Sequence, residues 1–165
     1  MHFNFLVLIA CVLICEAAGT TGLFTQFTSS SWYKSLRKSS LRPPGVFFEW
    51  AWVGVYALMG CALYLVWRMP AETHGRTMAL IIFAVQLVLS ALWPILFFRM
   101  RHPFISFVEL LVLWMFVLGT VVSFSYITLT AFFLLAPVMV WILFESYLNF
   151  TLISINEGPT VTSHM

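Results

Sequence analysis

"MALIIFAVQLVLSALWPILFF", residues 78–98, is the stretch that decides the fold class. It contains no Asp, Glu, Lys or Arg. A helix needs about 20 apolar residues to cross the hydrocarbon core of a bilayer, and this run is of that length. Apolar and polar residues do not alternate in it, and it is too long for a typical strand. The run therefore predicts a transmembrane helix.

The rest of the chain repeats this pattern. Further apolar runs lie at residues 3–24, 46–67, 104–124 and 129–155. The chain of 165 residues is 62% hydrophobic and 8% charged, whereas a soluble domain carries about 25% charged residues. In lipid the backbone polar groups need partners within the segment, which favours helices. We predict an all-α, integral membrane bundle of five transmembrane helices, forming a single domain over residues 1–165.

The first run has a second interpretation, as a cleavable signal peptide. "FNFLVLIACVLI" followed by "CEAAG" is typical of a signal-peptide core with a small-residue cleavage site. The expected basic segment before the core is missing, and apolar residues resume after Glu16. These two features favour a helix that is retained, and the alternative stays open.

The connections between the runs set the expected orientation. The loop at residues 25–45 is the longest, and the other connections are short. The first and third connections hold six Lys and Arg, and the second holds two, Arg68 and Arg76. Because basic loops stay on the cytoplasmic side of a membrane, loop one, loop three and the C-terminus are expected in the cytosol.

Composition argues against several other classes of function. The net charge of +2 is small and the charges are scattered, so no nucleic-acid partner is expected. All four His residues lie outside the predicted spans and have no ligand spacing, so we expect no metal site and no intramembrane haem. The three Cys residues lie in apolar runs and are interpreted as small buried hydrophobes.

Four carboxyl groups fall within the predicted spans. Glu16 and Glu145 are deep in their runs, where a charge costs several kcal/mol in lipid, so each should face a cavity or the bundle interior, or be protonated. Glu49 and Glu109 are predicted to lie in the first turn of their helices, where the helix dipole favours a negative charge. Pairing with a basic residue of loop one or three is a second possibility for Glu109.

Two aromatic stripes predict inward-facing surfaces. Pro137, Trp141, Glu145 and Asn149 are spaced by four in the last run and share one helix face. A matching stripe in the second run starts at Trp52 and Tyr56. Trp and Tyr have apolar plates with one polar edge. The stripes predict either a pocket for a flat apolar ligand or simple interhelical packing with an interfacial aromatic belt.

The quoted motifs also resemble a known family. "WYKSLRKSSLRPPGVF" and "WVGVYALMGCALYLVW" are similar to the signature of the translocator protein family, also called tryptophan-rich sensory proteins or peripheral-type benzodiazepine receptors. "QLVLSALWPILFF" and "APVMVWILFESYLN" resemble its third-helix and fifth-helix patterns. The resemblance covers about residues 5–155, and the spacing from Trp32 to Trp67 has no gaps.

The chain departs from the family pattern at several positions. Ser39 follows Lys38 where the family has Pro, and Ser90 stands where it has Asn. Phe150 replaces the Tyr of the animal sterol-recognition segment, and no basic residue follows it. Glu145 stands where a small residue is expected in the family's pocket, which implies a different ligand preference.

The resemblance implies a homodimer of five-helix protomers whose pocket is closed by loop one. The implied ligands are tetrapyrroles such as protoporphyrin IX and, in animals, cholesterol and benzodiazepine-type drugs; a porphyrin would be a ligand rather than a resident cofactor. In bacterial relatives two tryptophans that match Trp52 and Trp141 are implicated in light-dependent breakdown of porphyrin. These two are therefore the candidate catalytic residues, and whether the family turns over porphyrin as an enzyme is open.

Taken with the two stripes, the resemblance gives a set of expected ligand contacts from the lid, the second and third runs and the last run. They are Trp32, Leu36, Arg37, Lys38, Pro43, Pro44, Phe48, Tyr56, Gln86, Trp93, Glu145 and Asn149. The leading hypothesis is a membrane receptor or sensor for porphyrins, linked to tetrapyrrole handling or oxidative stress. A sterol or lipid carrier and a purely structural membrane scaffold are the alternatives. The host membrane is outer mitochondrial in animal relatives, secretory in plant relatives and the cell envelope in bacterial ones.

Overall fold

The structure is a computed structural model that describes residues 3–28 and 30–156. These residues form helices and connections without any strand. The elements in chain order are α1 (Phe5–Thr28), α2 (Ser30–Ser35), α3 (Gly45–Trp67), α4 (Arg76–Pro94), η1 (Ile95–Arg99), α5 (Pro103–Ile127) and α6 (Leu129–Asn156). Five helices are long and apolar enough to span a membrane, α4 and η1 forming one of them together. The predicted all-α, five-helix membrane fold is confirmed.

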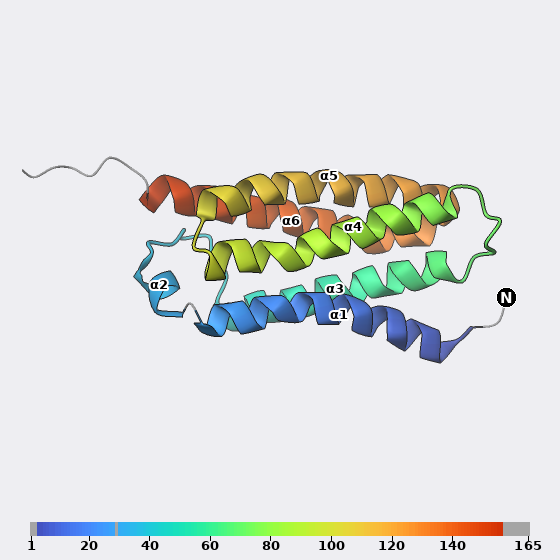
Figure 1. Ribbon diagram of the computed structural model, residues 1–165, viewed down its shortest axis with the longest axis horizontal. Helices are drawn as coiled ribbons and strands as arrows, with labels where there is room; N and C mark the ends of the chain where they lie inside the picture. The colour runs from blue at the N-terminus through green and yellow to red at the C-terminus, as the bar shows by residue number, and fades with distance from the viewer. Residues whose placement is uncertain (1–2, 29, 157–165) are drawn as a thin grey trace, which may run out of the picture.

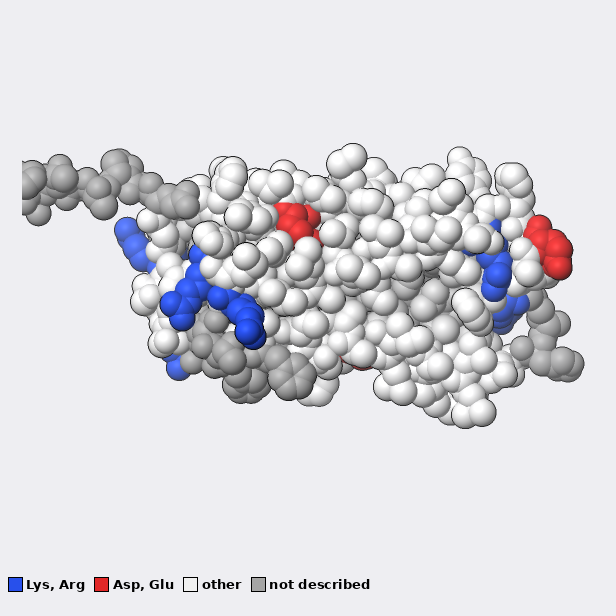
Figure 2. All heavy atoms as spheres, in the orientation of Figure 1, with Lys and Arg blue, Asp and Glu red and all other residues white. Residues whose placement is uncertain are grey.

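The five long helices close into a ring. α1 packs on α3 and α4, α3 packs on α6, and α5 packs on both α4 and α6. Figure 1 shows the helices running nearly parallel along the long axis, with α2 and the last turn of α6 at one end and the α3–α4 connection at the other. In Figure 2 the Lys and Arg side chains gather at the two ends, with a largely uncharged band between them. This distribution is the one expected of a bundle that crosses a bilayer.

The predicted lid loop at residues 25–45 is partly helical. α1 continues to Thr28, and α2 occupies Ser30–Ser35. The stretch from Thr25 to Arg42 contains neither Gly nor Pro, so no residue in it forces the helical conformation to end early. The break comes before α3, where Pro44 has φ −53° and ψ 144° and the helix begins at Gly45. Proline fixes φ and suits the start of a helix.

One glycine brings α1 and α3 into close contact. A Cβ atom added at Gly60 would lie 2.5 Å from the Cα atom of Val12 and 3.0 Å from the carbonyl oxygen of Cys11. Both atoms belong to the backbone of α1, so neither can move without shifting the helix. Small residues at such crossings let membrane helices approach each other. Gly60 therefore sets the spacing of the two helices that flank the pocket described below.

Pro94 changes the helical geometry at the end of α4. Proline has no backbone N–H and cannot continue the regular hydrogen-bond ladder. The next turn, η1, is a π-helix in which the backbone N–H of Met100 donates to the carbonyl of Ile95 at 2.9 Å. This wider turn leaves both Phe97 and Phe98 buried. Such π-turns are frequent at functional sites.

The end of α6 holds the lid. The side chain of Asn156 accepts from the backbone N–H of Arg37 at 3.0 Å and donates to the carbonyl of Arg37 at 2.9 Å. Asn156 also donates to the carbonyl of Leu152 on its own helix at 2.8 Å. Loop one and the last turn of α6 are thereby joined at one end of the bundle, which agrees with the predicted arrangement of the connections. Their location in the cytosol stays a prediction.

Candidate functional site: a cavity under the lid

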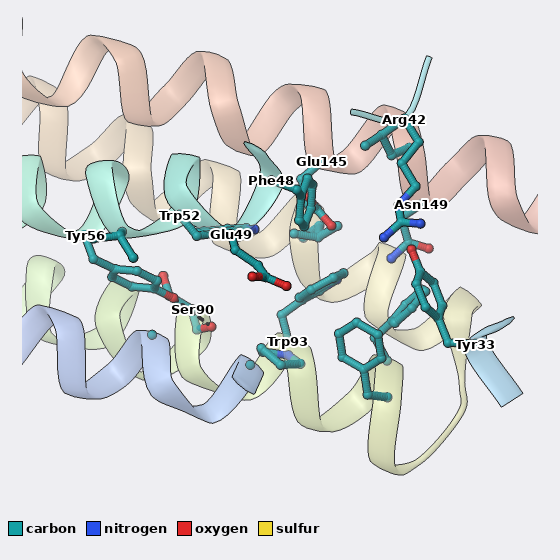
Figure 3. A pocket seen from close by; sticks show the side chains of 18 of the residues that line it. Tyr33, Arg42, Phe48, Glu49, Trp52, Tyr56, Ser90, Trp93, Glu145 and Asn149 are labelled. Atoms are coloured by element: carbon teal, nitrogen blue, oxygen red, sulfur yellow. Dashed lines mark hydrogen bonds between the residues drawn. The ribbon is translucent and has the colours of Figure 1, made fainter. Parts of the chain in front are cut away.

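A cavity of about 340 Å³ lies inside the ring of helices, below loop one. Ligand pockets in proteins are typically about 300–1,000 Å³, so the volume is within the usual range. The described residues that line it come from α1, α3, α4, η1, α5, α6 and the lid. Figure 3 shows the cavity between Trp52 and Tyr56 on one side and Trp93 on another, with Arg42, Tyr33 and Asn149 toward the lid end.

Aromatic rings form two of the cavity's walls. On α3, the rings of Trp52 and Tyr56 stack with centroids 5.6 Å apart and planes at 29°. On the α4–η1 segment, Trp93 and Phe97 stack at 5.1 Å and 20°. Phe48 lies edge-on to Trp52 at 6.5 Å. These rings offer flat apolar surfaces. An aromatic ligand that stacks on them is stabilised by more than the burial of its apolar area alone.

The lid closes the cavity through Tyr33. Its ring packs edge-on against Phe98 at 5.3 Å and against Phe97 at 5.9 Å. The Lys38 Nζ atom and the Arg42 Cζ atom each lie 5.0 Å from the centroid of the Tyr33 ring. A cation over an aromatic face is attracted by the ring quadrupole. The lid therefore brings two positive charges to the mouth of the cavity.

The same contacts change the titration of two lid residues. Burial raises the pKa of the Tyr33 hydroxyl, and the nearby Arg42 charge partly offsets this while the Glu145 carboxyl adds to it. The pKa of Lys38 is lowered by desolvation and by the neighbouring Arg42 charge. The Lys38 ammonium donates to the carbonyls of Leu36 at 2.9 Å and Lys34 at 3.3 Å. Two cations are thus held close together with no anion paired to either in the described part of the chain.

Two polar side chains of α6 reach the cavity. Glu145 is 4% exposed and Asn149 is 3% exposed, and both line the cavity. One oxygen of each, Glu145 Oε2 and Asn149 Oδ1, is buried without a hydrogen-bond partner among the described residues. A buried polar atom without a partner costs free energy in the unliganded protein. These atoms are therefore available to a ligand.

Comparison with known proteins shows which family the chain belongs to. The model of the TspO/MBR family matches residues 8–154. The chain belongs to the TspO/MBR family. The match runs from the first turns of α1 almost to the end of α6, so it includes the lid and every wall of the cavity.

Relatives of this TspO/MBR chain occur in several kinds of organism. A tryptophan-rich protein TspO from Chlorobaculum tepidum is 34% identical over 157 residues, which cover 94% of this chain and 99% of the relative. One from Archaeoglobus fulgidus is 36% identical over 154 residues, covering 93% and 99%. A translocator protein from Ovis aries is 31% identical over 128 residues, covering 77% and 76%. The family resemblance is confirmed, and the chain is a multi-pass membrane protein of the TspO/MBR sensor and translocator type.

The predicted contact residues fall into two groups in this TspO/MBR fold. One group lines the cavity: Lys38, Phe48, Trp52, Tyr56, Trp93, Glu145 and Asn149. The other group lies outside the described lining: Trp32, Leu36, Arg37, Pro43, Pro44, Gln86 and Trp141. Trp32 packs edge-on against Phe97 at 5.8 Å and so supports the cavity wall from behind. Arg37 is exposed at the lid surface.

The predicted stripe on the last helix is only partly inward-facing. Glu145 and Asn149 reach the cavity, but Pro137 is exposed on the outside of the bundle. Trp141 lies one layer back, against Phe48 at 5.5 Å and Trp52 at 6.0 Å. A spacing of four residues drifts around a helix of 3.6 residues per turn, and over three steps the drift separates Pro137 from Asn149.

The prediction for Glu49 and Glu109 was wrong. Neither lies in the first turn, since α3 begins at Gly45 and α5 begins at Pro103. Glu49 instead lines the cavity, and Figure 3 shows it pointing inward. Glu109 is buried on α5 with neither oxygen hydrogen-bonded in the described chain, and it pairs with no basic residue there. Each helix starts one residue earlier than predicted, so Glu49 is the fifth residue of α3 and Glu109 the seventh of α5. Glu49 is exposed and Glu109 is buried.

Several residues of the cavity walls were not among the ligand contacts predicted from the sequence. Tyr33, Glu49, Phe97 and Phe98 line the cavity and were absent from that set. The spacing of Glu49 with Trp52 and Tyr56, three and seven positions apart on one helix face, was a usable signal. The orientation of Phe97 and Phe98 depends on the π-turn, for which the sequence offers only Pro94. Glu16, predicted to face a cavity, does line it.

Metal ligands do not gather in the part of the chain that the structure describes. No three His, Cys or Glu side chains lie close enough to hold a metal ion there. His2 and His164 lie outside the described residues. The cysteines at 11, 15 and 61 are free thiols.

Proposed function

We propose that this TspO/MBR protein is a membrane receptor for porphyrins, with protoporphyrin IX as the representative ligand, and that it acts in tetrapyrrole handling or in the response to oxidative stress. The observation that carries the proposal is a cavity with flat aromatic walls below a lid that holds two cations without an anionic partner among the described residues. A porphyrin offers the complementary features. It is a flat apolar macrocycle that carries propionate groups on one edge.

The macrocycle would pack against the stacked rings of the cavity walls. Trp52 and Tyr56 present one wall and Trp93 with Phe97 present another. The propionates would point to the mouth and pair with Lys38 and Arg42. Charge-assisted hydrogen bonds of this kind are about twice as strong as neutral ones, and the guanidinium of Arg42 can grip a carboxylate with two N–H groups. Tyr33 would then close over the ligand edge.

A sterol or lipid carrier is the second candidate, because most of the lining is apolar: aromatic rings, Leu110, Leu113, Leu148 and Leu152. A sterol has no anionic group to use the two lid cations, so the porphyrin fits the mouth better. The light-dependent breakdown of porphyrin implied by the resemblance would require Trp52, which touches the cavity, more than Trp141, which does not. The homodimer and the cytosolic position of loop one stay predictions.

The experiment is a pair of equilibrium titrations on purified protein, one with protoporphyrin IX and one with cholesterol. Ring contact with Trp52 and Trp93 predicts saturable quenching of tryptophan fluorescence by protoporphyrin IX, with a lower dissociation constant than that of cholesterol. Tighter binding of cholesterol would favour the carrier. Absence of saturable binding by either ligand would favour a structural scaffold.

A further inference from the structure

The helical walls of the cavity carry carboxyl groups. Glu145 lines it from α6, Glu49 from α3 and Glu16 from α1. The two cations that line the cavity, Lys38 and Arg42, both belong to the lid. The cavity is therefore electrically asymmetric, positive at its mouth and acidic along its walls.

Of the three carboxyl groups that line the cavity, Glu145 is the most buried. Its side chain is 4% exposed, and its Oε2 atom has no hydrogen-bond partner in the described chain. Burying a carboxylate without a partner is costly, and a buried charge is normally paired. The Arg42 guanidinium lies over the Tyr33 ring, near enough for its charge to act on Glu145. Among the described residues, however, it makes no hydrogen bond to Glu145 Oε2.

Asn149 adds a second acceptor one helical turn away. The Ser106 hydroxyl is within hydrogen-bond distance of the carbonyls of His102 at 3.0 Å and Pro103 at 2.9 Å, so its hydrogen is used there. Its oxygen accepts from the Asn149 Nδ2 atom at 3.3 Å. This contact fixes the orientation of the amide and leaves Asn149 Oδ1 without a donor in the described chain. The α6 wall thus presents two acceptor oxygens, Glu145 Oε2 and Asn149 Oδ1, and neither receives a hydrogen bond from the described residues.

Aromatic faces surround the same region. Phe48 and Trp52 lie beside Glu145 in Figure 3, and Trp93 closes the opposite side. A cation close to such rings is attracted by their quadrupoles, most strongly when water is excluded. A buried carboxyl among aromatic rings is a suitable environment for a nitrogen cation on an apolar body.

We propose that the α6 wall of the cavity binds hydrophobic amines, in which a protonated nitrogen donates to Glu145 Oε2 and Asn149 Oδ1 and the apolar body packs on Trp52, Phe48 and Trp93. The site does not depend on porphyrin binding. It uses the opposite charge, on the α6 wall of the cavity instead of the lid. Glu145 is the residue that determines the preference for a cation, and this is the position where the chain departs from the small residue expected in the family.

The test compares two probes of nearly equal shape on the full-length protein in detergent at neutral pH. Naphthylmethylamine is protonated under these conditions, and naphthalenemethanol is neutral. The quantity measured is the ratio of their dissociation constants, by quenching of tryptophan fluorescence. The wild type should bind the amine roughly tenfold more tightly, the effect of one hydrogen bond to a charged group. Equal binding of the two probes by the wild type would overturn the proposal.

A matched pair of variants assigns the effect to one carboxyl. Glu145→Gln keeps the shape and removes the charge, and it should reduce the ratio to about one. Glu109→Gln changes a carboxyl that is also buried and unpartnered but does not line the cavity, and it should leave the ratio unchanged. An unchanged ratio in Glu145→Gln, or an equal loss in Glu109→Gln, would contradict the assignment. If Glu145→Gln does not fold, the wild-type ratio still decides the proposal.

Arg42→Gln separates this inference from the proposed porphyrin function. It should weaken protoporphyrin IX binding while the preference for the amine persists. If the wild type shows the preference for the amine but no porphyrin binding, the proposed function fails and this inference stands. If the wild type binds the porphyrin but shows no preference for the amine, this inference fails and the proposed function stands.

Discussion

Trp52 and Trp141 meet edge to face, with ring centroids 6.0 Å apart and ring planes at 89°, but only Trp52 lines the cavity. Trp141 supports it from α6, one layer further out. The two tryptophans that the family resemblance treats as a pair therefore have different positions relative to a ligand. One can touch the ligand, and the other acts through its neighbour.

This arrangement predicts unequal effects of the two Trp→Phe changes. Trp52→Phe should weaken protoporphyrin IX binding roughly threefold to tenfold, because an indole that stacks on the ligand is replaced by a smaller ring. Trp141→Phe should change it by less than about twofold, since it removes only an indirect contact. Fluorescence titration of the two variants measures both constants. A larger loss in Trp141→Phe than in Trp52→Phe would contradict the arrangement.

The same variants address the light-dependent reaction. Illumination of bound protoporphyrin IX, followed by its absorbance, should show slower loss in Trp52→Phe than in Trp141→Phe. A double variant, Trp52→Phe with Trp141→Phe, that degraded the porphyrin as fast as the wild type would remove both residues from the proposed chemistry.

The lid cations should select for anionic ligands. Neutralising Lys38 and Arg42 together, by Lys38→Gln and Arg42→Gln, should weaken protoporphyrin IX binding by about tenfold. Cholesterol binding should change by less than about twofold, because a sterol has no carboxylate for these side chains to pair with. Arg37→Gln is the matched control, as Arg37 is an exposed lid cation that does not line the cavity. Equal losses for both ligands would mean that the charges serve membrane topology alone.

Asn156 should control how fast the lid opens. Its side chain makes two hydrogen bonds with the Arg37 backbone, each of which contributes about 0.5–1.5 kcal/mol. Asn156→Ala should therefore raise the dissociation rate of protoporphyrin IX several-fold, measured by stopped-flow fluorescence. Ser154→Ala is a suitable control, because within residues 3–28 and 30–156 the Ser154 hydroxyl bonds only to the Phe150 carbonyl on its own helix. Equal rates in the wild type and Asn156→Ala would show that this contact does not hold the lid.

Gly60 should be far less tolerant of a methyl group than Gly54. Gly60→Ala places a Cβ atom 2.5 Å from the backbone of α1, whereas Gly54→Ala on the same helix meets nothing within 4 Å. Overpacking of this kind costs about 1–3 kcal/mol. Thermal unfolding in detergent should show a lower midpoint for Gly60→Ala, with Gly54→Ala at or above the wild-type value. The opposite order would mean that α1 and α3 are not in close contact.

Composition and run length were sufficient to predict the fold. A bilayer requires a long apolar run for each span, and residues 78–98 and the four other runs meet that requirement directly. Helix ends were harder, because the residues between Thr25 and Arg42 are compatible with either loop or helix. The added turns of α1 and the short α2 depend on packing against the bundle, as in the contacts of Tyr33 with Phe97 and Phe98.

The candidate site was predictable where one helix face decides it. Trp52 and Tyr56 share a face, as do Glu145 and Asn149, and all four line the cavity. Trp141 and Glu49 depend on a helix rotation of a fraction of a turn, which a spacing argument does not resolve. The paired burial of Phe97 and Phe98 depends on the π-turn after Pro94, which replaces the regular helical geometry.

The most direct test of the central claim is to fill the cavity. Thr20 and Ala17 are both exposed on α1, but only Thr20 lines the cavity. Equilibrium titration with protoporphyrin IX should then give different results for Thr20→Trp and Ala17→Trp. We predict that Thr20→Trp loses at least tenfold in affinity, since its indole occupies ligand space, while Ala17→Trp binds as the wild type does. Wild-type affinity in a folded Thr20→Trp protein would show that the porphyrin binds elsewhere and would contradict the account.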